Sequence, residues 1–323
     1  MRKAQLGSAK TQRGTGPAKS KTLSVSDLER EAQAWFLDGE IRQLSRNTLA
    51  LRRVLLDRFL RFLRENGHTH VDTTAVRAFL VSITKQGLRP KSVKNYYVDL
   101  SCLFRFLQTE GVVTTNPFDA ISRPRVPVDQ IQPFTVDQVR ALLTAAKRSR
   151  NPRRDEALLL LMLDTAARAS EVCGLRMSDL DLANRRCQVV GKGNKRRTLP
   201  FSAQTARALL RYLSQQERDP EDAVFLCERG ERTGCALSRY GLLDMVARLS
   251  RSAGLQGVRP SPHTLRHTAA IFYLRGGGNV FALKELLGHT ELRMVNRYLS
   301  LSQADVEAQH RQFSPVEQLR KSR

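Results

Sequence analysis

The sequence of 323 residues has no long hydrophobic run and few acidic side chains for its length. The apolar run at residues 157–163 is far shorter than the roughly 20 residues that a membrane-spanning helix needs. The basic N-terminus is not followed by an apolar segment that would serve as the core of a signal peptide. The sequence therefore predicts a cytoplasmic protein that does not bind a membrane.

Cysteine is also scarce, with five residues at scattered positions. None belongs to a C-x-x-C pair, and none lies at metal-ligand spacing from a histidine. This pattern disfavours a structural zinc site, and it predicts small core residues in a reducing compartment. The cysteines are Cys102, Cys173, Cys187, Cys227 and Cys235.

The shortage of acid leaves a large positive charge. The chain has 54 Lys and Arg against 31 Asp and Glu, a formal net charge of +23. Such a charge indicates a polyanionic partner rather than a fold. Because the basic residues run through the whole chain, nucleic acid is favoured over an anionic membrane or an acidic protein. Residues 1–22 hold six of these cations and no acid, which is typical of a solvated arm or of an extra contact to the DNA backbone.

Residues 23–118 contain no strand pattern, and apolar residues there recur at helical spacing. Asp72 and Pro90 mark the starts of helices predicted over 73–85 and from 90 to about 111. We expect a bundle of four or five helices. In the helix before Asp72, the expected buried face is Leu51, Val54, Leu55, Phe59, Phe62 and Leu63. In the helix from Pro90 it is Val93, Tyr97, Leu100, Phe104 and Leu107.

Basic side chains outside these apolar faces are candidates for contact with DNA phosphates. In the first segment they are Arg52, Arg53, Lys91 and Lys94. Lys195 and Arg197 join them from the hairpin described next.

The second half of the chain mixes helices with a hairpin. Asn116-Pro117 closes the first segment, because the residue before proline avoids helical geometry. A helix is predicted from Thr135, which forms a capping box with Gln138. Residues 155–164 are predicted to form a buried helix, and residues 187–200 a hairpin with a glycine-containing turn. Further helices are expected at about 203–215, 238–253, 264–275, 280–287, 291–298 and 303–311. The predicted segments are a basic arm (1–22), a helical domain (23–120), a linker (121–133), a mixed domain (134–315) and a tail (316–323).

Six side chains of this second domain suggest chemistry on a phosphodiester. A tyrosine phenol can attack phosphorus and hold a cut DNA end as a covalent ester. Guanidinium groups fit the phosphate oxygens on which charge accumulates in the transition state. A lysine can protonate the departing oxygen, and imidazole exchanges a proton near neutral pH. The six candidates are Arg168, Lys192, His263, Arg266, His289 and Tyr298.

Nucleotide binding and metal-dependent chemistry are both disfavoured. The Gly191–Lys195 turn lacks the spacing of a nucleotide-binding P-loop, and acids are too sparse near the motifs for a metal-dependent mechanism. We therefore expect no cofactor and no metal.

The surroundings of the candidate residues can also be predicted in part. Arg168 follows a very apolar segment, so its charge needs a partner, either Glu171 or Asp164. His263 and Arg266 share one face of a helix at i, i+3 spacing, and Gly288 is expected to end the helix before His289.

In this order, the six residues resemble the active-site set of the tyrosine recombinases, the family of phage integrases and Xer-type resolving enzymes. The resemblance extends over about residues 23–315. It implies a mainly α fold with a small β-sheet, in which a helical, SAM-like core-binding domain and an α+β catalytic domain form a C-shaped clamp on DNA. Tyr298 would then be the nucleophile, Lys192 (with Lys195 as the fallback) the catalytic lysine, and His267 a structural neighbour.

The resemblance also implies partners. We expect double-stranded DNA with an inverted-repeat core site, two protomers per site, and a tetramer that joins two sites. A second recombinase or a directionality factor is a further possible partner, and the basic arm favours a mobile element over chromosome-dimer resolution. Ala166 stands where the family more often has glycine. Two alternatives remain open: a type IB topoisomerase, and a DNA-binding protein whose active site has decayed.

Overall fold

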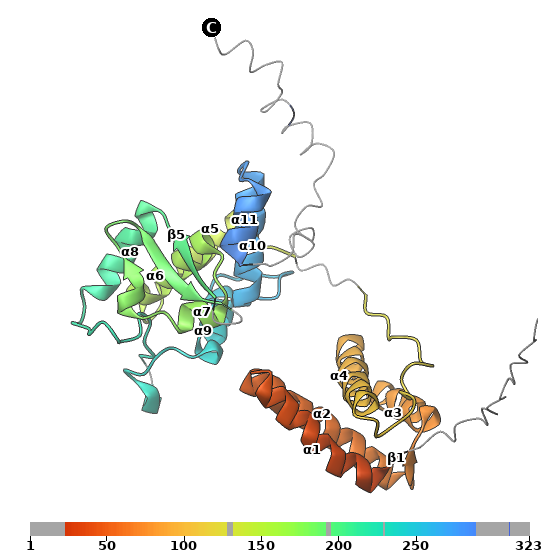
Figure 1. Cartoon of the computed structure of the whole chain (residues 1–323). Helices are drawn as coiled ribbons and strands as arrows, with labels where there is room; N and C mark the ends of the chain where they lie inside the picture. Colours follow the sequence, from red (N-terminus) through yellow and green to blue (C-terminus); the bar gives the residue numbers. More distant parts are fainter. Residues whose placement is uncertain (1–22, 128–131, 192–194, 229, 289–309, 311–323) are drawn as a thin grey trace, which may run out of the picture. The chain divides into compact units, whose positions relative to one another are not determined.

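The chain divides into two compact units, residues 1–129 and 130–323 (Figure 1). The structure, a computed structural model, describes residues 23–127, 132–191, 195–228, 230–288 and 310. The predicted arm at 1–22, the helix at 291–298, the helix at 303–311 apart from residue 310, and the tail at 316–323 lie outside these residues. In the described part of the chain, no helix combines the length and the hydrophobicity that crossing a bilayer requires.

Unit 1 is the predicted helical bundle. Its helices are α1 (Val25–Ile41), α2 (Arg46–Glu65), α3 (Thr73–Lys85) and α4 (Pro90–Thr109). Asp72 caps α3 by accepting a hydrogen bond from the Ala75 N–H at 2.7 Å, and Pro90 occupies the first turn of α4. Both predicted helix starts are confirmed, because each depends on a local preference that packing does not override.

The predicted buried face of α2 is partly wrong. Leu51 and Val54 are 47% and 60% exposed, whereas Leu56 and Leu60 are buried. The buried stripe passes instead through Arg52, whose guanidinium carbon lies 4.2 Å from the centre of the Trp35 ring. A repeat of three and four residues predicts a helix well, but it leaves the rotation of its buried face to the packing partner.

Two smaller differences also occur in unit 1. Residues Leu23–Ser24 (β1) pair antiparallel with His70–Val71 (β2), where we expected no strand. In α4 the buried tyrosine is Tyr96 rather than Tyr97, which is half-buried and donates a hydrogen bond to the Ile121 carbonyl at 2.9 Å. A two-residue strand is too short to produce an alternating pattern, which explains the first omission.

Unit 2 is built around one apolar helix, α6 (Pro152–Thr165), which lies in its core. Its elements are α5 (Val136–Lys147), α6, α7 (Ala169–Cys173), β3 (Leu180–Asp181), β4 (Arg186–Val190), β5 (Arg196–Pro200), α8 (Ala203–Leu213), α9 (Arg239–Ser252), α10 (Pro262–Arg275) and α11 (Val280–Leu287). The α6 helix packs against α5, α8 and α10, and its leucines form the centre of the core. The capping box of Thr135 and Gln138, the buried helix and the hairpin are confirmed. The short α7 and β3 were not predicted.

The hairpin strands place alternate side chains on the core. Cys187 and Val189 of β4 are buried, and their partners across the ladder are Leu199 and Arg197. Arg197 therefore belongs to the inward face of the hairpin. The Gly191 N–H donates to the Lys195 carbonyl at 2.8 Å, which closes the ladder just before the turn.

The cysteines follow no single rule. Cys187 is buried, but Cys102 and Cys235 are exposed, so the prediction of core positions is wrong for these two. Burial raises the pKa of the Cys187 thiol to about 12, which keeps it protonated and unreactive at neutral pH.

A small second core cluster joins the end of α6 to α10 and α11, which lie side by side (Figure 1). Its buried members are Ala166, Ala269, Ala270, Leu274, Leu283 and Leu287. Ala166 ends α6 in the left-handed conformation, with φ 50° and ψ 26°. This explains why glycine suits the position. An alanine there is strained, because its Cβ approaches the following carbonyl oxygen in the left-handed conformation.

We expect Ala166→Gly to change the free energy of unfolding by less than about 1 kcal/mol. Relief of left-handed alanine is worth roughly 1–2 kcal/mol, and it offsets the loss of a buried methyl group, about 0.8 kcal/mol. The matched control is Ala270→Gly, which is equally buried but lies inside α10. There the lost methyl adds to the cost of a helical glycine, for a total of about 2 kcal/mol. Urea unfolding of the full chain measures both, and equal destabilisation by the two variants would contradict the role of backbone strain.

Candidate functional site

Arg168 lies at the start of α7 and is held by Glu171. Its backbone N–H donates to Glu171 Oε2 at 2.7 Å, and its Nη1 donates to Oε1 at 2.9 Å. Of the two partners that the sequence left open, Glu171 is therefore confirmed and Asp164 is wrong. Asp164 instead accepts hydrogen bonds from the Ser202 N–H and the Thr205 hydroxyl at the start of α8. With its charge paired in this way, Arg168 is fixed but still one-third exposed.

Arg266 is buried in α10, with only 3% of its surface exposed. Its Nη1 donates to the Ala166 carbonyl at 2.6 Å and its Nη2 to the Leu287 carbonyl at 2.7 Å. These two bonds use two of the five N–H groups of a guanidinium. Arg266 thus connects the left-handed end of α6 to the last turn of α11.

His263 occupies the first turn of α10, which Ser261 caps by accepting a hydrogen bond from the Thr264 N–H. The residue is exposed, and its ring packs edge-on against the buried His267, with the ring centres 4.6 Å apart. His263 and Arg266 therefore lie one turn apart on the same helix, as their spacing predicts. An exposed imidazole on a fixed ring neighbour is suited to proton exchange with a bound substrate.

The C-terminus of α11 is where three arginines converge. Gly288 ends the helix in the left-handed conformation with φ 60°, as predicted. The last three carbonyls each accept a bond from a different arginine: Leu286 from Arg197 Nε at 3.1 Å, Leu287 from Arg266, and Gly288 from Arg168 Nη2 at 3.2 Å. The terminal carbonyls of a helix lack partners within it and carry partial negative charge, so cations stabilise them. This cluster directly precedes His289 in the sequence.

Arg197 is the member of this cluster whose role the sequence did not indicate. Its Nη1 and Nη2 donate to the two carboxylate oxygens of Glu171 at 2.7 and 2.8 Å, and only 14% of its side chain is exposed. All three guanidinium nitrogens thus have partners within the protein, although we expected the residue to contact DNA. The available signal was the alternation of β5, which places Arg197 on the same face as the buried Leu199.

Glu171 is the electrostatic centre of the site, with a side chain that is 2% exposed. Burial alone would raise the pKa of its carboxyl group. The hydrogen bonds from Arg197 and from the backbone and side chain of Arg168 outweigh that effect and lower the pKa below its ordinary value. Glu171 is therefore ionised at neutral pH and holds both arginines.

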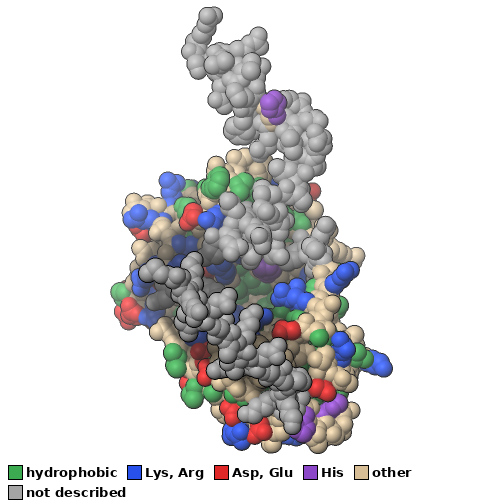
Figure 2. All heavy atoms as spheres, turned by 45° about the vertical axis from the view of Figure 1, so that its right-hand side comes forward, with side chains coloured by type: hydrophobic (Ala, Val, Ile, Leu, Met, Phe, Trp, Pro, Cys, Tyr) green, Lys and Arg blue, Asp and Glu red, His purple; other side chains and the backbone are tan. Residues whose placement is uncertain are grey.

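The remaining predicted residues differ in their accessibility. Arg53 and Lys91 are exposed, Lys94 is half-buried, and Lys195, directly before β5, is exposed. Arg52 lies against Trp35 with 14% of its side chain exposed. Across the face drawn in Figure 2, Lys and Arg side chains are spread widely, with acidic side chains between them. The predicted catalytic residues Lys192, His289 and Tyr298 lie outside the described residues.

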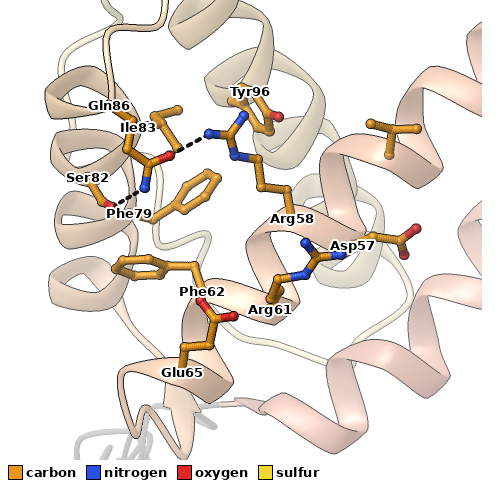
Figure 3. A pocket seen from close by; sticks show the side chains of 11 residues that line it. Asp57, Arg58, Arg61, Phe62, Glu65, Phe79, Ser82, Ile83, Gln86 and Tyr96 are labelled. Atoms are coloured by element: carbon orange, nitrogen blue, oxygen red, sulfur yellow. Dashed lines mark hydrogen bonds between the residues drawn. The ribbon is translucent and has the colours of Figure 1, made fainter.

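A cavity of about 620 Å³ in unit 1 has a different character. It lies between α2, α3 and α4 and contains none of the six candidates (Figure 3). Arg58 reaches across it and donates a hydrogen bond to the Gln86 side chain, which in turn donates to Ser82. Among the described residues, no three His, Cys, Asp or Glu side chains lie close enough together to hold a metal ion.

Both units of the chain match family models of one group of proteins. Residues 132–305 match the model of the phage integrase family, and residues 37–116 match the N-terminal SAM-like domain of phage integrases. Tyrosine recombinase XerC of Roseiflexus castenholzii is 31% identical over 289 residues, which cover 85% of this chain and 89% of the relative. XerC of Actinobacillus pleuropneumoniae is 33% identical over 72% of this chain and 74% of the relative.

Solved structures share the fold. The integrase of transposon Tn1549, in complex with a circular-intermediate DNA, has a TM-score of 0.70 at 20% identity and covers 90% of this chain and 100% of its own. A lambda integrase dimer bound to a core site has a TM-score of 0.68 at 20% identity, with 83% of this chain and 96% of its own covered. The resemblance inferred from six residues is confirmed by matches to both units, and the chain belongs to the phage integrase family of tyrosine recombinases.

Proposed function

We propose that this protein is a site-specific DNA recombinase that cuts and rejoins duplex DNA through a 3′-phosphotyrosyl intermediate. One observation carries the proposal. Arg168 and Arg266, which come from different elements, converge on the carbonyls of Leu287 and Gly288, directly before His289 in the sequence. Membership of the tyrosine recombinase family supports it. Two guanidinium groups held by protein partners are a preorganised environment for the charge of a five-coordinate phosphorus.

The proposed reaction needs neither ATP nor metal. The Tyr298 phenolic oxygen attacks the scissile phosphorus while the bond to the 5′-oxygen breaks, and His263 accepts the phenolic proton. Lys192 donates a proton to the departing 5′-oxygen, and Arg168, Arg266 and His289 stabilise the transition state. The 5′-hydroxyl of the partner strand then attacks the phosphotyrosine, so the energy of the phosphodiester is conserved in the ester.

The proposed assembly follows from the need to exchange strands. Two protomers occupy each inverted-repeat core site, and four join two sites in a synapse. The net charge of +23 supports a large electrostatic contribution to DNA binding. Integration or excision of a mobile element is the proposed setting, and a cytoplasmic location follows from the DNA substrate.

The test uses nicked suicide duplexes tiled across the DNA that flanks the gene. After cleavage of such a duplex the short fragment that carries the free 5′-hydroxyl diffuses away, so the covalent intermediate accumulates. We expect an SDS-resistant adduct, with the DNA on the peptide that contains Tyr298. Specific binding without an adduct would favour a DNA-binding protein with a decayed site.

A second assay separates recombination from simple relaxation. Two labelled duplexes carrying the cleaved site are incubated with the protein, and supercoiled plasmid is incubated in parallel. Joint molecules between the two duplexes are expected. Relaxation of the plasmid without any joint molecule would favour a type IB topoisomerase and contradict the proposal.

A further inference from the structure

Arg197 lies at the junction between two backbone segments that precede candidate catalytic residues. A Cβ atom placed on Gly191 would lie 3.3 Å from Arg197 Nη1, and one on Gly288 would lie 2.9 Å from the same atom. Gly191 directly precedes Lys192 in the sequence, and Gly288 directly precedes His289. One guanidinium group therefore contacts the hairpin where its turn begins and α11 where it ends.

The hydrogen bonds of Arg197 fix this junction to Arg168. Its two Nη groups form a bidentate pair of hydrogen bonds with the Glu171 carboxylate, while its Nε donates to the Leu286 carbonyl. Glu171 also binds the side chain and the backbone N–H of Arg168. A planar guanidinium group that is bound through both Nη atoms and through Nε is fixed in one orientation. The ammonium group of a lysine, which is a point charge on a flexible chain, would not reproduce it. The hairpin, α7 and α11 are thus held in one arrangement.

The burial of Arg197 argues against a direct phosphate contact. Its side chain is 14% exposed, its neighbour Arg196 is exposed, and the carboxylate that it binds is 2% exposed. If Arg197 moved away from Glu171 to contact DNA, a buried ion pair would be separated. The Glu171 carboxylate would then lose part of the positive charge that compensates it. The observed arrangement is therefore better suited to support than to DNA binding.

We propose that Arg197 is a positioning residue of the active site, which acts through Glu171 and the end of α11 to align Arg168 and the two backbone segments that precede Lys192 and His289 in the sequence. The inference rests on the proposed function. It predicts that loss of Arg197 slows cleavage without weakening DNA binding.

The experiment compares full-length Arg197→Ala and Arg197→Lys with the wild type and with Arg196→Ala. The control removes the same charge from the adjacent, exposed position of β5. DNA affinity is measured by gel shift over a range of KCl concentrations. The single-turnover rate of adduct formation is measured on the suicide duplex at saturating protein, and thermal unfolding verifies that each variant is folded.

We expect Arg197→Ala to form the adduct about 10²-fold more slowly, the effect typical of a misplacement near 1 Å. Its affinity and salt dependence should match those of the wild type, because no phosphate contact is lost. Arg197→Lys should recover part of the rate, since it restores charge without the bidentate pair of hydrogen bonds. Arg196→Ala should cleave at the wild-type rate once DNA is saturated.

Three results would overturn the inference. The first is a wild-type rate for folded Arg197→Ala or, should that variant not fold, for Arg197→Lys. The second is weaker binding at an unchanged saturated rate, with the salt slope reduced by about 0.9, as expected when one phosphate contact is lost. The third, the absence of any wild-type adduct, would overturn the proposed function as well. Adduct formation by the wild type therefore distinguishes the failure of one proposal from the failure of both.

Discussion

Tyr298→Phe should abolish the covalent protein–DNA adduct while leaving DNA binding intact. The substitution keeps the aromatic ring and removes only the oxygen that would attack phosphorus. Loss of a nucleophile typically costs at least about 10⁴-fold in rate, which places the reaction below detection in a gel assay. Affinity depends on the cations of the chain rather than on this hydroxyl, so the gel shift should be unchanged.

The matched control for this change is Tyr240→Phe. Tyr240 lies in α9 and is 82% exposed, so the same oxygen is removed from a position outside the site. Adduct formation by this variant should equal that of the wild type. Persistence of the adduct in Tyr298→Phe would assign the nucleophile to another residue, and equal loss in both variants would indicate a general defect.

Glu171→Gln should strongly destabilise unit 2. The carboxylate accepts four hydrogen bonds, two from Arg168 and two from Arg197, with a side chain that is 2% exposed. Glutamine has one acceptor oxygen, and its NH₂ group would face arginine donors. Removing one partner of a buried ion pair costs about 3–5 kcal/mol, because the remaining charge stays uncompensated.

The pH dependence of this loss has a definite sign. The pKa of Glu171 in the folded protein is lowered from its ordinary value of 4.5, so its charge stabilises the fold fully above about pH 4.5. The contribution is lost as the pH falls through the lowered folded pKa. Urea unfolding should therefore show a constant gap between wild type and Glu171→Gln from pH 7 down to about pH 5, and a shrinking gap in stronger acid.

An exposed ion pair provides the control for Glu171. Glu221, 75% exposed, pairs with Arg176, which is 56% exposed. Glu221→Gln should change stability by less than about 1 kcal/mol, as is usual for surface pairs. A gap for Glu171→Gln that is equally small, or that stays constant through the acid range, would contradict the structural role of the buried carboxylate.

The sequence predicted those features of the fold that depend on local preference. The starts of α3, α4 and α5 follow from Asp72, Pro90 and the Thr135 capping box, and each is found where expected. The buried face of α2 could not be predicted, because an arginine stacked on Trp35 replaces a leucine in its stripe. Pattern alone cannot assign a long cationic side chain to an interior position, since its burial depends on a ring supplied by another helix.

The site was predicted as a set of residue types but not as an arrangement. Arg168, His263 and Arg266 were proposed as site residues from their motifs, and the pairing of Arg168 with Glu171 was one of two open choices. The involvement of Arg197 could be found only in the folded structure, because Leu286 and Gly288 lie some ninety residues away along the chain. A helix end that accepts from three arginines is a property of packing, and no single segment of the sequence encodes it.

The arginines at the end of α11 also separate two uses of positive charge. Charges on the surface are screened by added salt, with a screening length of about 8 Å at 0.15 M and about 3 Å at 1 M, whereas a buried pair is screened far less. Raising the ionic strength should therefore release DNA steeply while leaving the Glu171–Arg197 contact intact. Once DNA is saturated, the cleavage rate should be nearly independent of KCl, so salt can control how often this protein occupies DNA without altering how it cuts.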